Sequence, residues 1–296
     1  MEGICPTTGV ERILLSTDGS EFSEGAVREG IELAKKCSSS LSVLFAVHYN
    51  PEFAALAPQI LEKREKDARL HLDMVRDRAL KEGIECLPVL EKGEDAYKSI
   101  VAYAEKNNSS MIVMGRRGRT GLKRLMMGSV TARVIGHAHC NVLVVPRAAE
   151  LKFRSIVVAT DGSRHSTAAV SHAIGLARRN NSQLTVIAVV PAEIAAPTDL
   201  DFTINMRDKL AEEEMRHAEQ NARVAKEAAE KEGVGVKAYV MTGKPAEAII
   251  QTAAEGKADL IVVGSHGRTG LERLMLGSVA ERVIVLAACP VLVVKK

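Results

Sequence analysis

The sequence predicts an α/β protein made of two similar domains, each built on a parallel sheet with helices on both faces. The chain has 296 residues, about twice the usual length of one domain. A long motif near the middle of the chain returns close to its end, and short apolar runs alternate with helical stretches throughout. Such alternation is typical of parallel sheets that helices cover on both sides.

An internal repeat indicates the number of domains. GRRGRTGLKRLMMGS at 115–129 and GSHGRTGLERLMLGS at 264–278 agree at 11 of 15 positions and are 149 residues apart. TDGS at 17–20 recurs at 160–163, only 143 residues later. A period near 150 is the size of a domain and too long for a solenoid unit. We therefore expect domains at 1–148 and 149–296, with six extra residues between the two motifs of the second copy.

Each copy has the same order of elements. Apolar runs predict strands at 12–17, 41–48, 111–114 and 142–145 in the first copy, and at 155–160, 184–190, 260–263 and 291–294 in the second. Helical patterns predict helices at about 20–36 and 58–82, and at about 163–179 and 206–232, with Gly83 and Gly233 as helix stops. A further strand and helix come before 111 and 260, and a short helix follows each glycine motif.

Composition argues against several classes of protein. The net charge of +3 is too small to favour a nucleic-acid partner, and no apolar stretch approaches the length of a membrane span. The five cysteines are odd in number and include no CxxC, a pattern that suits a reducing compartment. We therefore expect a cytoplasmic protein with neither a nucleic-acid nor a membrane partner.

Both repeated motifs fall at the carboxyl ends of predicted strands. Asp18 and Asp161 end the first strand of each copy, and the glycine motifs end the fourth. Open parallel sheets bind their ligands at this edge. The sequence thus predicts one ligand crevice in each domain.

The residue types of the glycine motif suit a phosphate group. The first two glycines of each motif permit a close approach of backbone to ligand, and positive φ. The last glycine and the serine after it open a helix, whose free N–H groups attract anions. Two structural alternatives remain, because glycine-rich turns also occur without ligands and the aspartate can serve only the turn beside Ser20 or Ser163. In a functional role, that carboxylate accepts ribose hydroxyls or helps to hold a metal on the phosphates.

These spacings, G-x2-G-x9-G-S in both copies, resemble the nucleotide-binding signature of the universal stress protein family. The resemblance covers nearly the whole chain, as two family domains in tandem. It implies Rossmann-like (adenine nucleotide alpha hydrolase-like) domains with five-stranded parallel sheets, which bind ATP or AMP, with Mg²⁺ accompanying ATP, in a stress response. It also implies pairing of the domains through their last strands and allows a homodimer.

The resemblance assigns site residues by position. Asp18 and Asp161 would contact ribose, with Thr17 and Thr160 beside them. Ala46 and Val189 would lie by the adenine, and Ala46 departs from the valine that the resemblance leads us to expect. The residues that would wrap the phosphates are Gly115, Gly118, Gly128 and Ser129 in the first domain, and Gly264, Gly267, Gly277 and Ser278 in the second.

The two loops differ in charge. The first contains Arg116, Arg117, Arg119, Lys123 and Arg124, where the second has Ser265, His266, Arg268, Glu272 and Arg273. The three additional cations predict tighter or more salt-sensitive phosphate binding in the first domain.

Three functional hypotheses follow. The first is a regulatory protein that binds adenine nucleotides, one per domain. The second is a slow Mg²⁺-dependent ATPase, and the third is a partner-binding protein whose sites are vestigial. No Walker motif, GxSxG elbow or nucleophile–base pair is present, so no catalytic residue is predicted.

Overall fold

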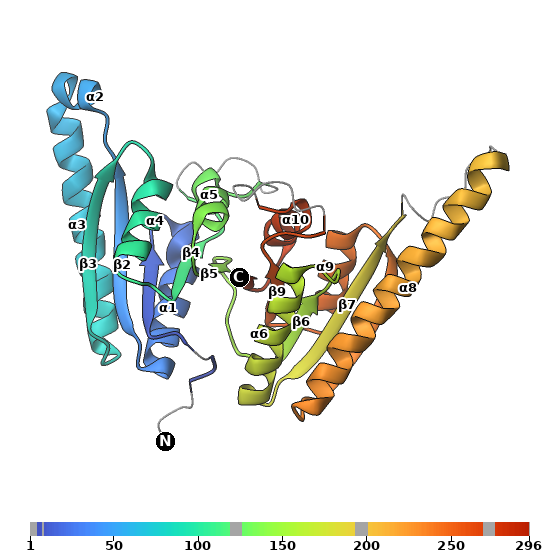
Figure 1. Ribbon diagram of the computed structural model, residues 1–296. Coiled ribbons are helices and arrows are strands. Elements are labelled where there is room, and N and C mark those ends of the chain that lie inside the picture. The colour runs from blue at the N-terminus through green and yellow to red at the C-terminus, as the bar shows by residue number, and fades with distance from the viewer. Residues whose placement is uncertain (1–4, 8, 119–125, 193–200, 269–275, 296) are drawn as a thin grey trace. The chain divides into compact units, whose positions relative to one another are not determined.

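The computed structural model describes residues 5–7, 9–118, 126–192, 201–268 and 276–295, without the side chains of residues 53 and 201–208. The chain forms two compact units that divide between Glu150 and Leu151. Each unit contributes five parallel strands, and helices cover both faces of them (Figure 1). The predicted α/β architecture of two tandem domains is therefore confirmed.

The elements of the two units follow the predicted order. The first unit contains β1 (Arg12–Ser16), the short 3-10 helix η1 (Glu21–Ser23), α1 (Glu24–Cys37), β2 (Ser40–His48), α2 (Pro51–Leu56), α3 (Pro58–Lys81), β3 (Cys86–Gly93), α4 (Ala96–Lys106), β4 (Met111–Gly115), α5 (Ser129–His137) and β5 (Asn141–Val145). The second contains β6 (Ser155–Ala159), α6 (Arg164–Asn180), β7 (Gln183–Pro191), α8 (Asp201–Lys231), β8 (Val236–Gly243), α9 (Pro245–Glu255), β9 (Leu260–Gly264), α10 (Ser278–Leu286) and β10 (Val291–Val294).

The strand order places the first and fourth strands side by side in the middle of each sheet. It is β3-β2-β1-β4-β5 in the first unit and β8-β7-β6-β9-β10 in the second. Ile13 of β1 is in register with Leu41 of β2 and Met111 of β4, in parallel pairing. The carboxyl ends of β1 and β4 therefore meet at one edge, as do those of β6 and β9.

Aliphatic side chains fill both cores, in a chain in which aromatic residues are only 3% of the total. The largest side chains that are fully buried are Ile13, Leu14, Leu15, Leu44, Ile112 and Ile135 in the first unit, and Ile156, Leu184, Ile187, Ile249, Leu260 and Ile261 in the second. Because the central strands are buried on both faces, they form continuous apolar runs and do not alternate with polar residues.

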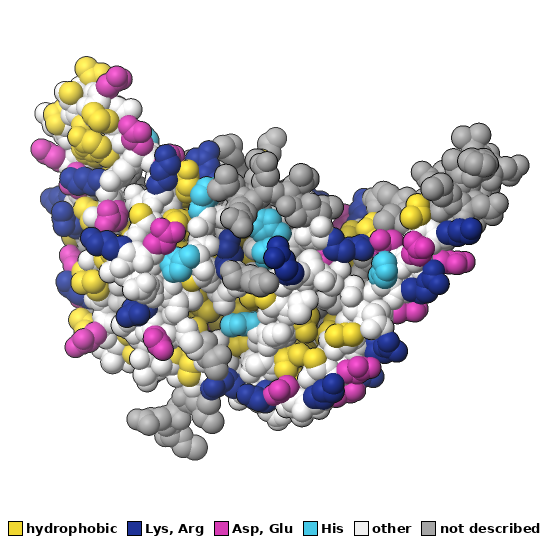
Figure 2. Space-filling view, in the orientation of Figure 1, with side chains coloured by type: hydrophobic (Ala, Val, Ile, Leu, Met, Phe, Trp, Pro, Cys, Tyr) yellow, Lys and Arg dark blue, Asp and Glu magenta, His cyan; other side chains and the backbone are white. Residues whose placement is uncertain are grey.

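The long helices α3 and α8 pack through equivalent faces. Four buried residues of α3 correspond, 150 positions later, to four buried alanines of α8: Ala68, Leu72, Val75 and Ala79 match Ala218, Ala222, Ala225 and Ala229. Acidic and basic side chains are interspersed along the exposed surface of α8 (Figure 2). No helix in the described part of the chain is long and apolar enough to cross a membrane.

A disulfide joins Cys5, ahead of β1, to Cys37, the last residue of α1. Their Cα atoms are 4.2 Å apart and they are separated by 32 positions in the sequence. Cys86, Cys140 and Cys289 are not part of a disulfide. Disulfides are more typical of oxidising compartments, so the cysteine pattern does not serve as evidence for a reducing one.

Candidate functional site

Each domain has a cavity at the carboxyl ends of its central strands. The cavity volumes are about 240 Å³ in the first domain and about 290 Å³ in the second. Both are slightly below the range of roughly 300–1,000 Å³ that is usual for ligand pockets. All fourteen site residues predicted from the sequence line these cavities: Thr17, Asp18, Ala46, Gly115, Gly118, Gly128 and Ser129 in the first, and Thr160, Asp161, Val189, Gly264, Gly267, Gly277 and Ser278 in the second.

The aspartate after the first strand uses one carboxylate oxygen to hold the turn. Oδ1 of Asp18 accepts hydrogen bonds from the backbone N–H and the hydroxyl of Ser20, at 3.0 and 2.7 Å. Oδ1 of Asp161 accepts the backbone N–H of Ser163 at 3.0 Å. The glycine between them has positive φ in each turn, 72° and 79°. Each aspartate therefore does stabilise the turn, which was its structural alternative, but this role uses only one of its two carboxylate oxygens.

The second carboxylate oxygen faces the glycine loop. A Cβ built on Gly118 would lie 2.6 Å from Oδ2 of Asp18, and one built on Gly267 would lie 2.8 Å from Oδ2 of Asp161. Oδ2 of Asp161 also accepts the backbone N–H of Arg268 at 2.9 Å. Burial alone would raise the pKa of Asp161, but hydrogen bonds from Ser163, Ser166 and the Arg268 backbone outweigh it and lower that pKa. Asp161 is therefore an anion at neutral pH.

The described glycines of the loops serve close approach and do not have positive φ. The glycines with positive φ among the described residues lie elsewhere, so this part of the sequence interpretation is wrong. A Cβ on Gly115 would lie 2.8 Å from the carbonyl oxygen of Phe22, and one on Gly264 would lie 2.8 Å from that of His165. The first glycine of each motif thus lets the end of the fourth strand pack against the turn that follows the first strand.

A backbone hydrogen bond closes the base of each loop. Gly128 N–H donates to the carbonyl of Arg116 at 3.0 Å, and Gly277 N–H donates to that of Ser265 at 2.9 Å. Gly128 and Gly277 are the N-caps of α5 and α10, and neither helix has a side-chain cap. The amino end of each helix therefore lines the cavity, and its first N–H groups have no partner within the helix. Arg119, Lys123, Arg124, Glu272 and Arg273 lie outside the described residues.

Apolar side chains form the opposite wall of each cavity. The first cavity is lined by Ala46, Ala96, Ile100, Met114 and Val130, and the second by Val189, Pro245, Ile249, Val263 and Val279. Of these apolar residues, the sequence predicted only Ala46 and Val189, which lie in the second strand of each domain. Val130 and Val279 are the second residues of α5 and α10. The others come from the helix before the fourth strand and from the fourth strand itself, where apolar character does not distinguish them from core residues.

The polar surroundings of the first-strand threonine also differ between domains. Thr17 Oγ1 lies 2.9 Å from Ser23 Oγ and 3.0 Å from Nε2 of His71 on α3. Thr160 Oγ1 lies 3.4 Å from Ser166 Oγ. At the position of His71, the register of the long helices places Asn221, whose side chain lies against Gly162.

Thr131 Oγ1 donates to the carbonyl of Gly115 at 3.0 Å, which ties α5 to the end of β4.

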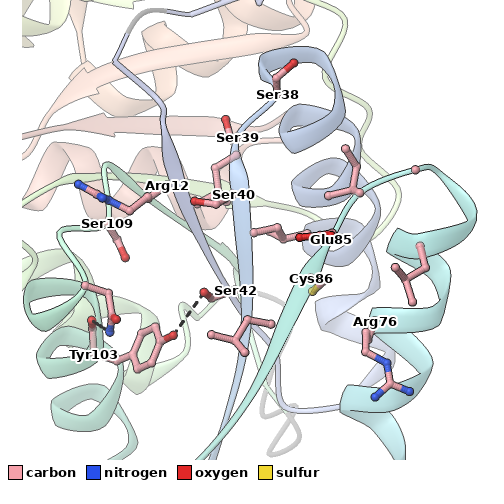
Figure 3. Close-up of a pocket in the computed structure, with 17 residues that line it drawn as sticks. Arg12, Ser38, Ser39, Ser40, Ser42, Arg76, Glu85, Cys86, Tyr103 and Ser109 are labelled. Atoms are coloured by element: carbon pink, nitrogen blue, oxygen red, sulfur yellow. Dashed lines mark hydrogen bonds between the residues drawn. The ribbon is translucent and has the colours of Figure 1, made fainter.

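A larger hollow, of about 990 Å³, lies at the amino ends of β1, β2 and β3 (Figure 3). Several of its polar groups already have partners: the Tyr103 hydroxyl donates to Ser42 Oγ at 3.3 Å, and Arg12 Nε donates to the carbonyl of Asn108 at 3.1 Å. Arg76 forms ion pairs with Asp73 and Asp77. This end of a parallel sheet is not where such folds bind ligands, so the smaller cavities are the better candidate sites despite their volume.

Comparisons with known proteins agree with the repeated architecture. The universal stress protein family matches the chain twice, at residues 9–146 and 152–295. A universal stress protein of Methanocaldococcus jannaschii is 41% identical over 150 residues, which are 51% of this chain and 86% of that protein. One of Mycolicibacterium smegmatis is 29% identical over 96% of both chains. The crystal structure of a universal stress protein from Archaeoglobus fulgidus matches with a TM-score of 0.70 at 25% identity, over 97% of this chain and 99% of that one. The chain therefore belongs to the universal stress protein family, as two family domains in tandem.

Proposed function

We propose that each domain binds one adenine nucleotide and that the protein acts as a nucleotide-responsive regulator in a stress response. The observation that carries this proposal is that two separate motifs converge on one cavity, and do so in both domains. A chance glycine turn would not be expected to meet the same aspartate and the same apolar wall twice.

The nucleotide contacts the apolar wall of each cavity with its base and the polar wall with its ribose and phosphates. The adenine base packs against the apolar wall, beside Ala46 in the first domain and Val189 in the second. Oδ2 of Asp18 or Asp161 accepts the ribose hydroxyls, because Oδ1 is held by the turn. In the second domain the ribose then replaces the Arg268 backbone N–H as the partner of Oδ2.

The phosphates bind along the glycine loop and at the amino end of α5 or α10. The helix dipole supplies only about 0.3–1 kcal/mol, whereas micromolar affinity needs about 8 kcal/mol. Loop N–H groups, basic side chains and burial of the base must supply the rest. Among the described residues, no cluster of three or more His, Cys, Asp or Glu side chains could hold a metal ion. Mg²⁺ accompanying ATP would therefore bind mainly through the phosphates and water.

Hydrolysis is not part of the proposal. Both carboxylate oxygens of Asp161 already accept hydrogen bonds, from Ser163 and from Arg268. Phosphoryl transfer needs a positioned water and concentrated positive charge, and a carboxylate held in this way is poorly placed to orient a water. Pairing of the domains through their last strands, and a homodimer, stay predictions.

Calorimetric titration of the full chain with ATP and with AMP tests the proposal. We expect up to two sites per chain, with Asp18→Ala and Asp161→Ala each removing one and the double variant removing both. Asp67→Ala, at an exposed position of α3, is the matched control and should bind like the wild type. Failure of the wild-type chain to bind either nucleotide would contradict the function. Undiminished binding by the double variant would contradict the assigned sites.

A further inference from the structure

Two acidic side chains hold Arg268 in the second domain. Its backbone N–H donates to Oδ2 of Asp161 at 2.9 Å. Its guanidinium donates to both carboxylate oxygens of Glu214 on α8, from Nη1 at 3.1 Å and from Nη2 at 2.6 Å. Arg268 directly follows Gly267 and lines the cavity. Arg268, which lies within the glycine loop, is thus bound both at its backbone and at its side chain.

The pairing with Glu214 is a specific one. A bidentate contact between guanidinium and carboxylate is the strongest geometry for such a pair. The side chain of Glu214 is 25% exposed and that of Arg268 is 44% exposed. Hydrogen bonding to Glu214 raises the pKa of Arg268, and the same contact lowers the pKa of Glu214. Both groups therefore stay charged at neutral pH, and the positive charge of Arg268 is compensated before any ligand arrives.

The first domain has no acid at the corresponding position. The buried faces of α3 and α8 align at an offset of 150 residues, which places Arg64 where the second domain has Glu214. The side-chain charge at this helix position is therefore positive in the first domain and negative in the second. In the second domain the side chain at this position contacts the loop residue Arg268. Glu214 is a feature of one site and not of the shared fold.

We propose that Glu214 competes with the nucleotide's phosphates for Arg268 in the second domain. In the free protein Glu214 binds the guanidinium. A ligand with a polyphosphate draws Arg268 away from it, and this breaks the contact between the loop and α8. The inference rests on the proposed function. Because Glu214 compensates the charge of Arg268, the second site prefers polyphosphates less strongly than it would without Glu214.

The test uses the full chain with Asp18→Ala, so that only the second site is measured. ATP and adenosine are titrated against this background, alone and with Glu214→Gln, Arg268→Gln or both. Glu214→Gln should tighten ATP binding by about two- to five-fold, the range expected for a partly exposed ion pair. Adenosine affinity should not change, because adenosine offers no group to Arg268. In the Arg268→Gln background, Glu214→Gln should have no effect on ATP.

Glu213→Gln is the matched control, since it removes the same charge from an exposed neighbour on α8. It should leave ATP affinity unchanged, which separates the specific contact from a general charge effect. Unchanged or weaker ATP binding by Glu214→Gln, or equal tightening for adenosine, would overturn the inference while leaving the proposed function intact. Absence of nucleotide binding by the wild-type chain would overturn both.

Discussion

Gly264 packs against His165 so closely that a Cβ at Gly264 would lie 2.6 Å from the carbonyl carbon of His165. The first domain repeats the relationship between Gly115 and Phe22. The first glycine of the signature is therefore required by the protein's own backbone. A change at this position should disturb the site through the fold, even in the absence of a ligand.

Gly264→Ala should destabilise the protein by about 1–3 kcal/mol, the usual cost of forcing extra volume into a packed region. The methyl group would meet backbone atoms, which cannot rotate away as a side chain can. Chemical denaturation compares this variant with Gly175→Ala, within α6, where a Cβ meets nothing within 4 Å. The control should be stabilised by up to about 1 kcal/mol, because alanine is favoured within helices. Equal stabilities for the two variants would refute the close-approach explanation.

Reduction of the Cys5–Cys37 disulfide should lower the free energy of unfolding of the first domain by about 2–4 kcal/mol. The bond restricts the unfolded chain by closing a loop across 32 positions. Denaturation with and without reductant measures the effect, and Cys37→Ser, which lacks the bond, should show no response to reductant. Titration of five free thiols in the denatured, unreduced protein would show that the bond does not form.

Alkylation of Cys86 and Cys289 should be slow at pH 8 in the folded protein. Burial disfavours the charged thiolate and raises the pKa of each thiol to about 11, so about one thiol in a thousand is ionised at pH 8. The rate should rise with pH until it approaches that value. Peptide mapping after iodoacetamide treatment follows each site, with an unstructured cysteine peptide as the reference. Rapid modification of either residue at pH 8 would contradict the burial.

ATP binding should depend more strongly on salt in the first domain than in the second. Arg117 lines the first cavity, whereas the corresponding residue of the second cavity is His266. Asp161→Ala isolates the first site and Asp18→Ala isolates the second. Titrations at low and high salt should give a steeper loss of affinity for the first site. Identical slopes would argue that the loop cations do not reach the phosphates.

The sequence was sufficient to predict which residues of the repeated motifs line the candidate cavities. Asp18 and Gly118 are 100 positions apart, yet the strand order required both to reach one edge of the sheet. Periodicity and the rule for parallel sheets were enough for that prediction. Helix stops such as Gly83 were equally accessible, because a glycine with positive φ after an amphipathic run has a local cause.

Contacts between single side chains from distant segments could not be predicted in this way. Glu214 and Arg268 are 54 positions apart and belong to no shared pattern. The disulfide likewise joins two cysteines without a motif, because only the packing of the amino-terminal segment against the end of α1 brings them together. The close packing of Gly264 on His165 also depends on tertiary structure. The sequence suggested close approach to a ligand and positive φ for that glycine, whereas the structure shows close approach to the protein's own backbone.

The most direct test of the account is to denature the purified protein and identify any released nucleotide by chromatography and mass spectrometry, with its amount per chain. A protein isolated without nucleotide is titrated with ATP and AMP. We predict that the denatured protein releases up to two molecules of adenine nucleotide per chain. If it was isolated without nucleotide, we predict that the folded chain binds up to two molecules on titration. A chain that releases none and binds neither ATP nor AMP would contradict the central claim.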